Sequence, residues 1–371
     1  MTVEEFSSHA AAWLRHHASS ARRDYGAICP PDLIDTAIEW QRTVNAAGFA
    51  GIHWPVEDGG RGLTVEHNAV WQYQCALAGV PAAINMVGLV LTAGALLSFG
   101  TEAQREQHLR PTLRADHIWC QLFSEPGAGS DLASLSTRAE RDGDQFVING
   151  QKVWCSGGRY SNWGILMART DPDAAKHMGI SFFLLPMGLP GVEVRPLRQM
   201  TGESEFDEVF FTDVRLPADH LIGPLHDGWN VGMAVLNSER GHIGTSIIGL
   251  ERRLESMATA IGGRPITPTA RNELARLMST GSAYKATAQR QGPITSVAAS
   301  LMKLGITEVM FDFALLRTSF AGADAMLDGA ESTGVLAAPG GRIAGGTSQV
   351  QRNIIGERLL GLPREPKLPG A

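Results

Sequence analysis

A block of short strand-like runs in the middle of the chain constrains its fold most. QFVINGQKVWC at 145–155 contains two such runs joined by Asn149-Gly150, a pair typical of a hairpin turn. Short strands separated by Gly, Pro and Asp predict a small antiparallel barrel or sandwich over residues 118–222. The further runs lie at 163–170, 180–186, 192–197 and 208–217.

The residues before this block have a helical pattern. In FGTEAQREQHL, Thr101 and Gln104 stand at the two positions of a capping box, which predicts that a helix starts there. GIHWPVEDGGRGL at 51–63 carries Pro and several Gly, so it predicts an ordered loop. The apolar run at 86–99 is too short to span a bilayer, and we expect a buried helix.

Helical spacing of apolar residues returns after residue 223, and an Ala-rich bundle is expected there. The stretch 327–341 predicts a loop. We therefore expect an α+β protein with a helical N-terminal domain (1–117), a β domain (118–222) and a C-terminal helical bundle (223–371). The long helical runs lie near 228–260, 267–290 and 294–328.

The composition excludes several classes of protein. The net charge of −6 is spread over mixed acidic and basic residues, so no basic face indicates nucleic-acid binding. The cysteines form no CxxC pair and no zinc-type spacing with histidine, so we expect free thiols, a reducing compartment and no metal. Without a visible signal sequence or membrane span, a soluble cytoplasmic protein is expected. The cysteines are Cys29, Cys75, Cys120 and Cys155.

Familiar phosphate and nucleophile motifs do not occur, but LFSEPGAGSDLAS at 122–134 is unusual. GxGxxG, GxxxxGK[ST] and GxSxG are all missing. In the unusual stretch, Gly127 and Gly129 allow close approach of a ligand to the backbone, and Ser124 and Ser130 can donate hydrogen bonds. The alternative is an ordinary Gly-Ser loop that enters the β region.

Two further sequence features suggest a flat cofactor with a phosphate. Trp154 and Ser156 lie two residues apart on a predicted strand, where they share a face and can wall an aromatic ring, although a strand Trp is more often core. RIAGGTSQV at 342–350 places glycines and hydroxyls at a helix start, an arrangement that favours phosphate. That stretch contains no acid, base or nucleophile.

The chain resembles the acyl-CoA dehydrogenases, a family of FAD-dependent enzymes. The motifs CQLFSEPGAGSD, INGQKVW followed by Ser, VFFTDVRLP, GWNVGMAVLNSERG and GGTSQVQRNIIGERLLGLPR match in order over nearly the whole chain. The resemblance implies the family fold, which is a helical N-terminal domain, a β-barrel-like middle domain and a C-terminal four-helix bundle. It also implies FAD as cofactor. The residues that would contact FAD are Gln121, Phe123, Ser124, Gly129, Ser130, Trp154, Ser156, Thr347, Ser348 and Gln349.

The same resemblance raises the question of the catalytic base. Most relatives carry a Glu in the C-terminal loop, where this chain has Gly345. A minority place the Glu on a bundle helix directly before an Arg, which corresponds to Glu239 and Arg240 here. Glu239 lies four residues after Val235 on an apolar stripe, where desolvation would raise the pKa of its carboxyl.

Alternatives remain for these residues. Glu239 can instead be a partly buried acid paired to a neighbour, and Arg240 a bundle ion pair; Glu251, beside two arginines, resembles a surface acid. Gly345 retains an N–H that would bond the thioester carbonyl, as the family loop does. The resemblance assigns substrate contacts to Ser130, Asn237, Arg240 and Gly346. The small side chains at 344–346 favour a branched or bulky acyl chain.

The expected reaction is α,β-dehydrogenation of an acyl-CoA to the trans-2-enoyl-CoA, with an electron-transferring flavoprotein as acceptor. The expected assembly is a homotetramer, a homodimer or a heteromer with a related subunit. However, AIGGRPI at 260–266 stands where many relatives have the Arg-x-x-Phe-Gly element that reaches a neighbouring subunit's FAD. A heteromer with a related subunit, in which this chain binds FAD without being catalytic, is therefore an alternative. An oxidase on the same scaffold is another.

Overall fold

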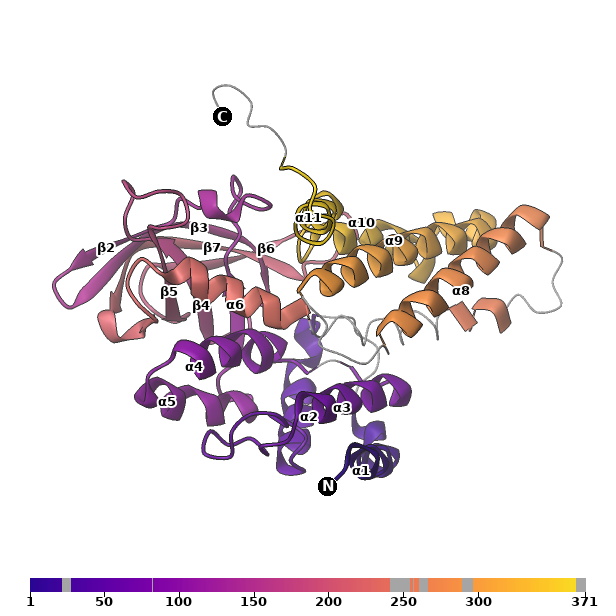
Figure 1. Ribbon diagram of the computed structural model, residues 1–371, viewed down its shortest axis with the longest axis horizontal. Helices are drawn as coiled ribbons and strands as arrows, with labels where there is room; N and C mark the ends of the chain where they lie inside the picture. Colours follow the sequence, from indigo (N-terminus) through magenta and orange to yellow (C-terminus); the bar gives the residue numbers. More distant parts are fainter. Residues whose placement is uncertain are drawn as a thin grey trace. The chain divides into compact units, whose positions relative to one another are not determined.

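The computed structural model describes residues 1–21, 28–81, 83–240, 254–255, 257–259, 266–288 and 296–364; the side chains of 237–240, 288 and 296–298 lie outside this description. The chain divides into two compact units, Met1–Glu239 and Arg240–Ala371. Figure 1 shows the sheet with its helices in the first unit and the long helices α8, α9 and α10 in the second. None of the described helices is long and apolar enough to cross a membrane.

The helical part of the first unit is built around aromatic side chains. Phe6, Ala10 and Leu14 recur every four residues on α1 and are buried, as an amphipathic helix requires. Phe49 stacks on Trp71 with ring centroids 4.4 Å apart. The elements are α1 (Val3–His17), η1 (Ala18–Ser20), η2 (Pro31–Leu33), α2 (Ile34–Ala46), α3 (Val65–Ala78), η3 (Val87–Thr92), α4 (Ala93–Phe99) and α5 (Glu102–Leu113).

Two expectations for this region are confirmed. Thr101 Oγ1 accepts from Gln104 N at 3.2 Å and Gln104 Oε1 accepts from Thr101 N at 3.0 Å, which completes the capping box of α5. The apolar run 86–99 forms η3 and α4, and its most buried residues belong to the core. The first part, η3, is a π-helix rather than an α-helix, a detail that apolar patterning does not reveal.

A sheet of eight strands forms the middle of the first unit. Its order is β6-β7-β3-β2-β4-β5-β8, with β1 beside β4. Most neighbours are antiparallel, as expected, but β4 pairs in parallel with β1 and β2. The strands are β1 (Trp119–Leu122), β2 (Arg138–Asp142), β3 (Gln145–Ser156), β4 (Trp163–Arg169), β5 (Ile180–Pro186), β6 (Val192–Leu197), β7 (Phe206–Pro217) and β8 (Leu221–Ile222), with η4 (Leu132–Ser134) and η5 (Ala218–His220) between strands.

The predicted hairpin turn at Asn149-Gly150 is wrong. β3 runs straight through this pair, and the turn that joins β2 to β3 lies at residues 143–144. The pair forms a bulge instead, because Asn149 exchanges hydrogen bonds with Asp213 of β7 at 2.9 and 3.0 Å. A Cβ at position 150 would lie 2.6 Å from Thr137 Oγ1, so this position requires glycine for close approach.

Helix α6 (Gly228–Arg240) packs against this sheet. Val231 and Val235 are fully buried, and a Cβ at Gly232 would lie 2.9 Å from Met167 Sδ of β4. The last four residues of α6 include three of the predicted site residues, and their side chains lie outside the description. They are Asn237, Glu239 and Arg240.

The second unit contains the expected long helices. The long helices are α8 (Pro268–Ala288) and α9 (Ser296–Ala321), and they are followed by η7 (Gly322–Met326), α10 (Ala330–Ile343), α11 (Ser348–Ile354) and the π-helical η8 (Ile355–Leu359). The predicted loop at 327–341 is wrong, because most of it forms α10. At the start of this helix the amide of Gly329 donates a hydrogen bond to the Ser332 hydroxyl, and α10 continues through Pro339. Packing on α9 outweighs the low helix propensity of the proline and of the glycines in α10.

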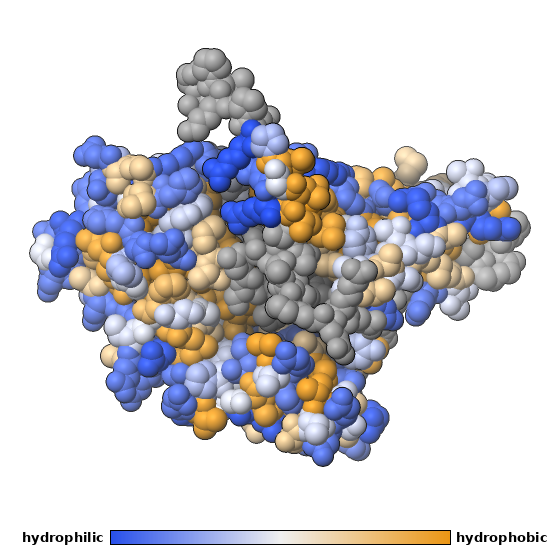
Figure 2. All heavy atoms as spheres, viewed as in Figure 1, coloured by the Kyte–Doolittle hydropathy of each residue, from blue (hydrophilic) through white to orange (hydrophobic). Residues whose placement is uncertain are grey.

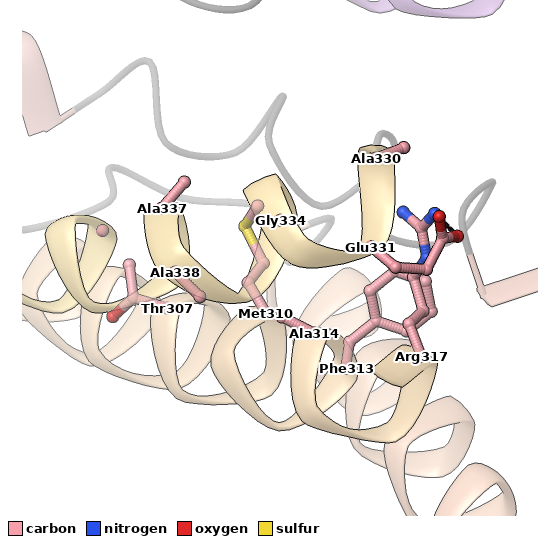
Figure 3. Close-up of a pocket in the computed structure, with 11 residues that line it drawn as sticks. Thr307, Met310, Phe313, Ala314, Arg317, Ala330, Glu331, Gly334, Ala337 and Ala338 are labelled. Atoms are coloured by element: carbon pink, nitrogen blue, oxygen red, sulfur yellow. Dashed lines mark hydrogen bonds and ion pairs between the residues drawn. The ribbon is translucent and has the colours of Figure 1, made fainter. Parts of the chain in front are cut away.

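Helices α9 and α10 line a half-open pocket of about 240 Å³. Figure 3 shows Met310 and Phe313 rising from α9 toward the small residues of α10, with the ion pair between Arg317 and Glu331 at one end. The remaining lining residues are Thr307, Ala314, Ala330, Gly334, Ala337, Ala338 and Gly341. The small side chains of α10 leave this space unfilled.

Candidate functional site

The loop from Phe123 to Ser130 follows β1, and a buried lysine of β3 holds its first residues. Lys152 Nζ donates to Phe123 O at 3.0 Å and to Glu125 Oε1 at 2.8 Å, and its side chain is fully buried. The neighbouring amide of Val153 donates to Ser124 O at 2.9 Å. Two consecutive carbonyls of the loop therefore bond to β3.

Glu125 ties the same loop to the start of β2. Its Oε2 accepts from the amide and the hydroxyl of Ser136 at 2.7 and 2.8 Å, and its Oε1 accepts from the amide of Thr137 at 2.8 Å. Burial works to raise the pKa of this carboxyl, but Lys152 and these bonds together lower it to about 2. Glu125 is thus a buried carboxylate at neutral pH, with each oxygen satisfied.

The far half of the loop is open and rich in N–H donors. A Cβ at Gly127 or Gly129 would meet no atom within 4 Å. Within the described part of the chain, the amides of Gly127, Gly129 and Ser130 donate to no protein group. Ser130 is exposed and Ser124 is half-buried. Amides without a partner beside open space suit a ligand with acceptor atoms, such as ring carbonyls or a phosphate.

Trp154 lies close to this loop along β3 and is presented to solvent by a bulge. The register of β3 against β7 shifts between Lys152 and Cys155, and Trp154 has a φ of +63°, which is strained for a bulky residue. Its side chain is 55% exposed and touches Phe206 edge to face. The alternative of a core tryptophan is therefore wrong, because the bulge turns this residue out of the sheet's core.

The turn after Ser156 is fixed by an acid that the sequence analysis missed. Asp207 is fully buried opposite Cys155; it accepts from the amide of Arg159 at 3.0 Å and pairs with the guanidinium of Arg159 at 2.8 Å. Burial raises the pKa of this carboxyl above its ordinary value even though Arg159 opposes the shift. Ser156 itself is half-buried beside this turn.

In the second unit, the residues before α11 form a loop whose carbonyls accept hydrogen bonds from side chains of the same unit. Gly345 and Gly346 have φ values of +65° and +94°. Gln351 Nε2 donates to Gly345 O at 3.0 Å, and Lys303 Nζ donates to Gly346 O at 2.6 Å. Burial lowers the pKa of Lys303, while Glu308 opposes this shift. The amides of both glycines donate to no group of the described chain.

The hydroxyls predicted to bind phosphate have partners inside the second unit. Thr347 Oγ1 caps α11 by accepting from Val350 N at 3.2 Å. Ser348 is buried, and its hydroxyl donates to Glu308 at 2.7 Å; Glu308 also pairs with Arg342 at 3.0 Å. Gln349 is exposed. Thr347 and Ser348 therefore also stabilise the helix start, whatever they bind.

Gln121 and Phe123 occupy the base of the first-unit loop. Gln121 is half-buried on β1, whereas Phe123 is buried and contacts Phe182 edge to face, so only its backbone is suited to line a ligand. The charged residues below the loop, Lys152 and Glu125, were missed because charges in a β region usually point to solvent. Glu125 lies within the motif EPGAGS and Lys152 within INGQKVW.

The arrangement in the first unit fits FAD. The isoalloxazine of FAD is a flat aromatic ring with acceptor atoms on its edge. The structure brings an exposed indole, half-buried hydroxyls and amides without a partner together along one loop and one strand. Gly127 and Gly129 leave the space that a ring or pyrophosphate needs. Among the described residues no cluster suited to a metal ion occurs.

Sequence profiles of known families match three successive parts of the chain. The profile of the acyl-CoA dehydrogenase N-terminal domain matches residues 4–116, that of the middle domain matches 120–214 and that of the C-terminal domain matches 226–360. Acyl-CoA dehydrogenase IpdE1 of Mycobacterium tuberculosis (strain ATCC 25618 / H37Rv) is 37% identical, over 98% of this chain and 99% of its own. IpdE1 of Mycolicibacterium smegmatis is 35% identical over the same shares.

Solved structures agree in fold over nearly the full length. One described as the Tcur3481-Tcur3483 steroid ACAD superposes with a TM-score of 0.86 at 26% identity and covers 98% of both chains. The ChsE4-ChsE5 complex from Mycobacterium tuberculosis superposes with a TM-score of 0.81 at 26% identity, over 98% of this chain and 99% of its own. Both descriptions name two different chains.

Proposed function

Because the chain belongs to the acyl-CoA dehydrogenase family, whose FAD-dependent oxidoreductases act on acyl-CoA, we propose that it converts an acyl-CoA thioester to the trans-2-enoyl-CoA. FAD, when bound, supplies at N5 the acceptor for the β-hydride. The open, donor-rich loop at 127–130 beside the exposed Trp154 carries this proposal. The proposal includes the FAD contacts predicted from the sequence and the domain boundaries 1–117, 118–222 and 223–371.

Removal of the α-proton needs a base, and the proposal assigns it to Glu239. Gly345 has no side chain to take a proton. Glu239 lies near the end of α6, four residues after the buried Val235. An acid in apolar surroundings has a raised pKa and is well suited to remove a weakly acidic proton. Asn237, Arg240, Ser130 and Gly346 are the proposed substrate contacts.

Gly345 is proposed to act through its backbone. Its amide has no partner in the described chain, while its carbonyl, on the next peptide group, is held by Gln351, so the loop is anchored beside an available N–H. An N–H in this position can stabilise the negative charge that develops on the thioester oxygen. This role does not depend on a side chain, so glycine at this position is compatible with the proposed reaction.

The proposed substrate carries a bulky acyl group. No atom lies within 4 Å of a Cβ at Gly345, and its neighbours are alanine at 344 and glycine at 346. A structural relative at 26% identity is described as a steroid ACAD. The proposed electron acceptor is an electron-transferring flavoprotein, and the proposed assembly is a heteromer with a related subunit, since two structural relatives are described by pairs of chains.

Anaerobic flavin bleaching tests the reaction and the base. Purified protein with bound FAD is mixed with straight, branched and ring-bearing acyl-CoAs, and absorbance near the flavin maximum is followed. We expect Glu239→Gln to lose at least a thousandfold in rate while it still binds FAD. The matched control is Glu251→Gln, which should bleach like the wild type. Equal bleaching by wild type and Glu239→Gln would show that another group is the base.

A second candidate function follows from Gly345 and from the relatives' paired chains. This chain would then bind FAD and complete a partner without being catalytic itself. Co-expression with a related chain distinguishes the two functions: turnover of the pair that is lost with Glu239→Gln in this chain supports the first, and turnover of the pair that Glu239→Gln leaves unchanged supports the second. Rapid reoxidation with release of peroxide in air would instead indicate an oxidase.

A further inference from the structure

A single buried cation connects the two parts of the proposed FAD site in the first unit. Lys152 lies on β3 two residues before Trp154, and its Nζ reaches back to Phe123 O and to the carboxylate of Glu125. No other described charged group is placed to do this, because the contacts of Glu125 beyond Lys152 come from Ser136 and Thr137. Lys152 therefore bridges the strand and the loop.

The direction of these bonds determines which groups of the loop remain for a ligand. Phe123 O and Ser124 O bond toward β3, and the amide and carbonyl of Glu125 pair with Ala128 across a tight turn at 3.1 and 3.0 Å. The amides of Gly127, Gly129 and Ser130 are left without partners in the described chain. The loop thus has acceptors on its inner side and donors available outside.

We propose that Lys152 is a positioning residue of the FAD site, which draws Phe123 O and Glu125 toward β3 and so leaves the amides of 127–130 available to FAD. This role depends on the FAD site proposed above. It differs from simple charge balance, in which Lys152 would only neutralise the buried Glu125. Removing the charges of Lys152 and Glu125 together distinguishes the two roles.

The test compares four variants of the full chain in two measurements. FAD affinity of the apoprotein is measured by quenching of flavin fluorescence, and Tm by calorimetry without FAD. Lys152→Met leaves Glu125 buried without its cation, and Glu125→Gln leaves Lys152 without its anion, so both should lower Tm and weaken FAD binding at least tenfold. The surface control Lys176→Met, which breaks an exposed pair with Asp131, should match the wild type.

The double variant Glu125→Gln with Lys152→Met decides between the roles. Without either buried charge it should regain much of the lost Tm, but Phe123 O still lacks its donor, so FAD should bind at least tenfold more weakly than to the wild type. Recovery of wild-type FAD affinity together with Tm would overturn the proposal. A wild type that binds no FAD would instead refute the site itself, which keeps the two failures distinct.

A pH series on folded protein gives a second measurement if the neutral variants do not fold. Burial, opposed by Glu125, lowers the pKa of Lys152 to about 8; the other facing group is the Cys155 thiol, whose pKa burial raises well above its ordinary value. FAD binding to the wild type should weaken as the pH rises through 8. Lys152→Arg keeps its charge and should show no such step. Equal pH profiles for both proteins would overturn the proposal.

Discussion

At the scale of residues, two adjacent glycines shape the loop before α11 in different ways. Gly345 and Gly346 both have positive φ, where a side chain is strained. A Cβ on Gly345 would lie in open space, whereas a Cβ on Gly346 would lie 2.6 Å from Gln351 Nε2. That amide is the donor that holds Gly345 O. The second glycine is therefore required by packing as well as by its backbone conformation.

Alanine substitutions distinguish these requirements. Gly345→Ala should lower the free energy of unfolding by about 1 kcal/mol, from backbone strain alone. Gly346→Ala should cost about 2–3 kcal/mol, since it adds the displacement of Gln351 and the loss of its hydrogen bond. Urea unfolding followed by far-UV circular dichroism measures both. Equal costs for the two variants would contradict the contact between Gly346 and Gln351.

At the scale of elements, α10 is a helix of low intrinsic propensity that leaves a cavity against α9. It contains Gly334, Gly340 and Gly341 as well as Pro339, and none of its residues is fully buried. The gap between the helices persists because the facing side chains of α10 are small. On the other side, α9 approaches α8 closely, since a Cβ at Gly305 would lie 1.8 Å from the ring of Tyr284.

Two glycine-to-alanine changes should therefore have opposite effects. Gly334→Ala meets no atom within 4 Å and replaces a poor helix former, so it should raise the free energy of unfolding by about 0.5–1 kcal/mol. Gly305→Ala should lower it by about 2–3 kcal/mol through overpacking against Tyr284. Calorimetric Tm values of both variants test this. A Tm of Gly334→Ala below that of the wild type would contradict the open space beside Gly334.

At the scale of the whole molecule, the two units have cores of different character. The first unit contains all eight tryptophans of the chain and two large apolar clusters on the helices and the sheet. The second has smaller clusters built mainly from aliphatic side chains. In the space-filling view, apolar side chains lie at the surface around α11, and Leu359, Leu360 and Leu362 are each more than half exposed (Figure 2).

Tryptophan fluorescence therefore reports on the first unit and on its sensitivity to acid. His108 is buried among Trp119 and Trp163 and shares a hydrogen bond with His117 at 3.2 Å. Burial, helped by His117 and His220, lowers its pKa to about 3. The unfolded chain takes up a proton near pH 6.5, so stability is lost as the pH falls below that value, by about 1.4 kcal/mol at pH 5.5.

Replacing this histidine should remove that part of the acid sensitivity. His108→Phe keeps the aromatic packing and cannot take up a proton, so its stability should fall about 1.4 kcal/mol less between pH 7.5 and 5.5 than that of the wild type. The exposed His16→Phe is the control and should keep the wild-type slope. Urea titrations monitored by tryptophan emission measure all three. Identical slopes for His108→Phe and the wild type would exclude a neutral buried His108.

The sequence was sufficient for the fold class and the family, because these depend on local patterns. Each of these patterns lies within a short stretch of consecutive residues: the capping box at Thr101, each strand run between 145 and 217, and each of the long motifs. It failed where a distant partner decides. Asn149-Gly150 has the composition of a turn, yet the bonds between Asn149 and Asp213 of β7 make it a bulge. The helix at 330–343 depends on packing against α9 in the same way.

For the candidate site, the sequence by itself determined only the candidate residues: Ser124, Ser130, Trp154 and a loop with glycine where a carboxylate is usual. Only the tertiary structure decided how they are presented. Strand alternation places Trp154 on one face but cannot show that a bulge turns it outward. Nor does any local pattern show that Lys152 is buried, because its two partners lie 27 and 29 residues earlier and meet it only when β3 packs beside the loop.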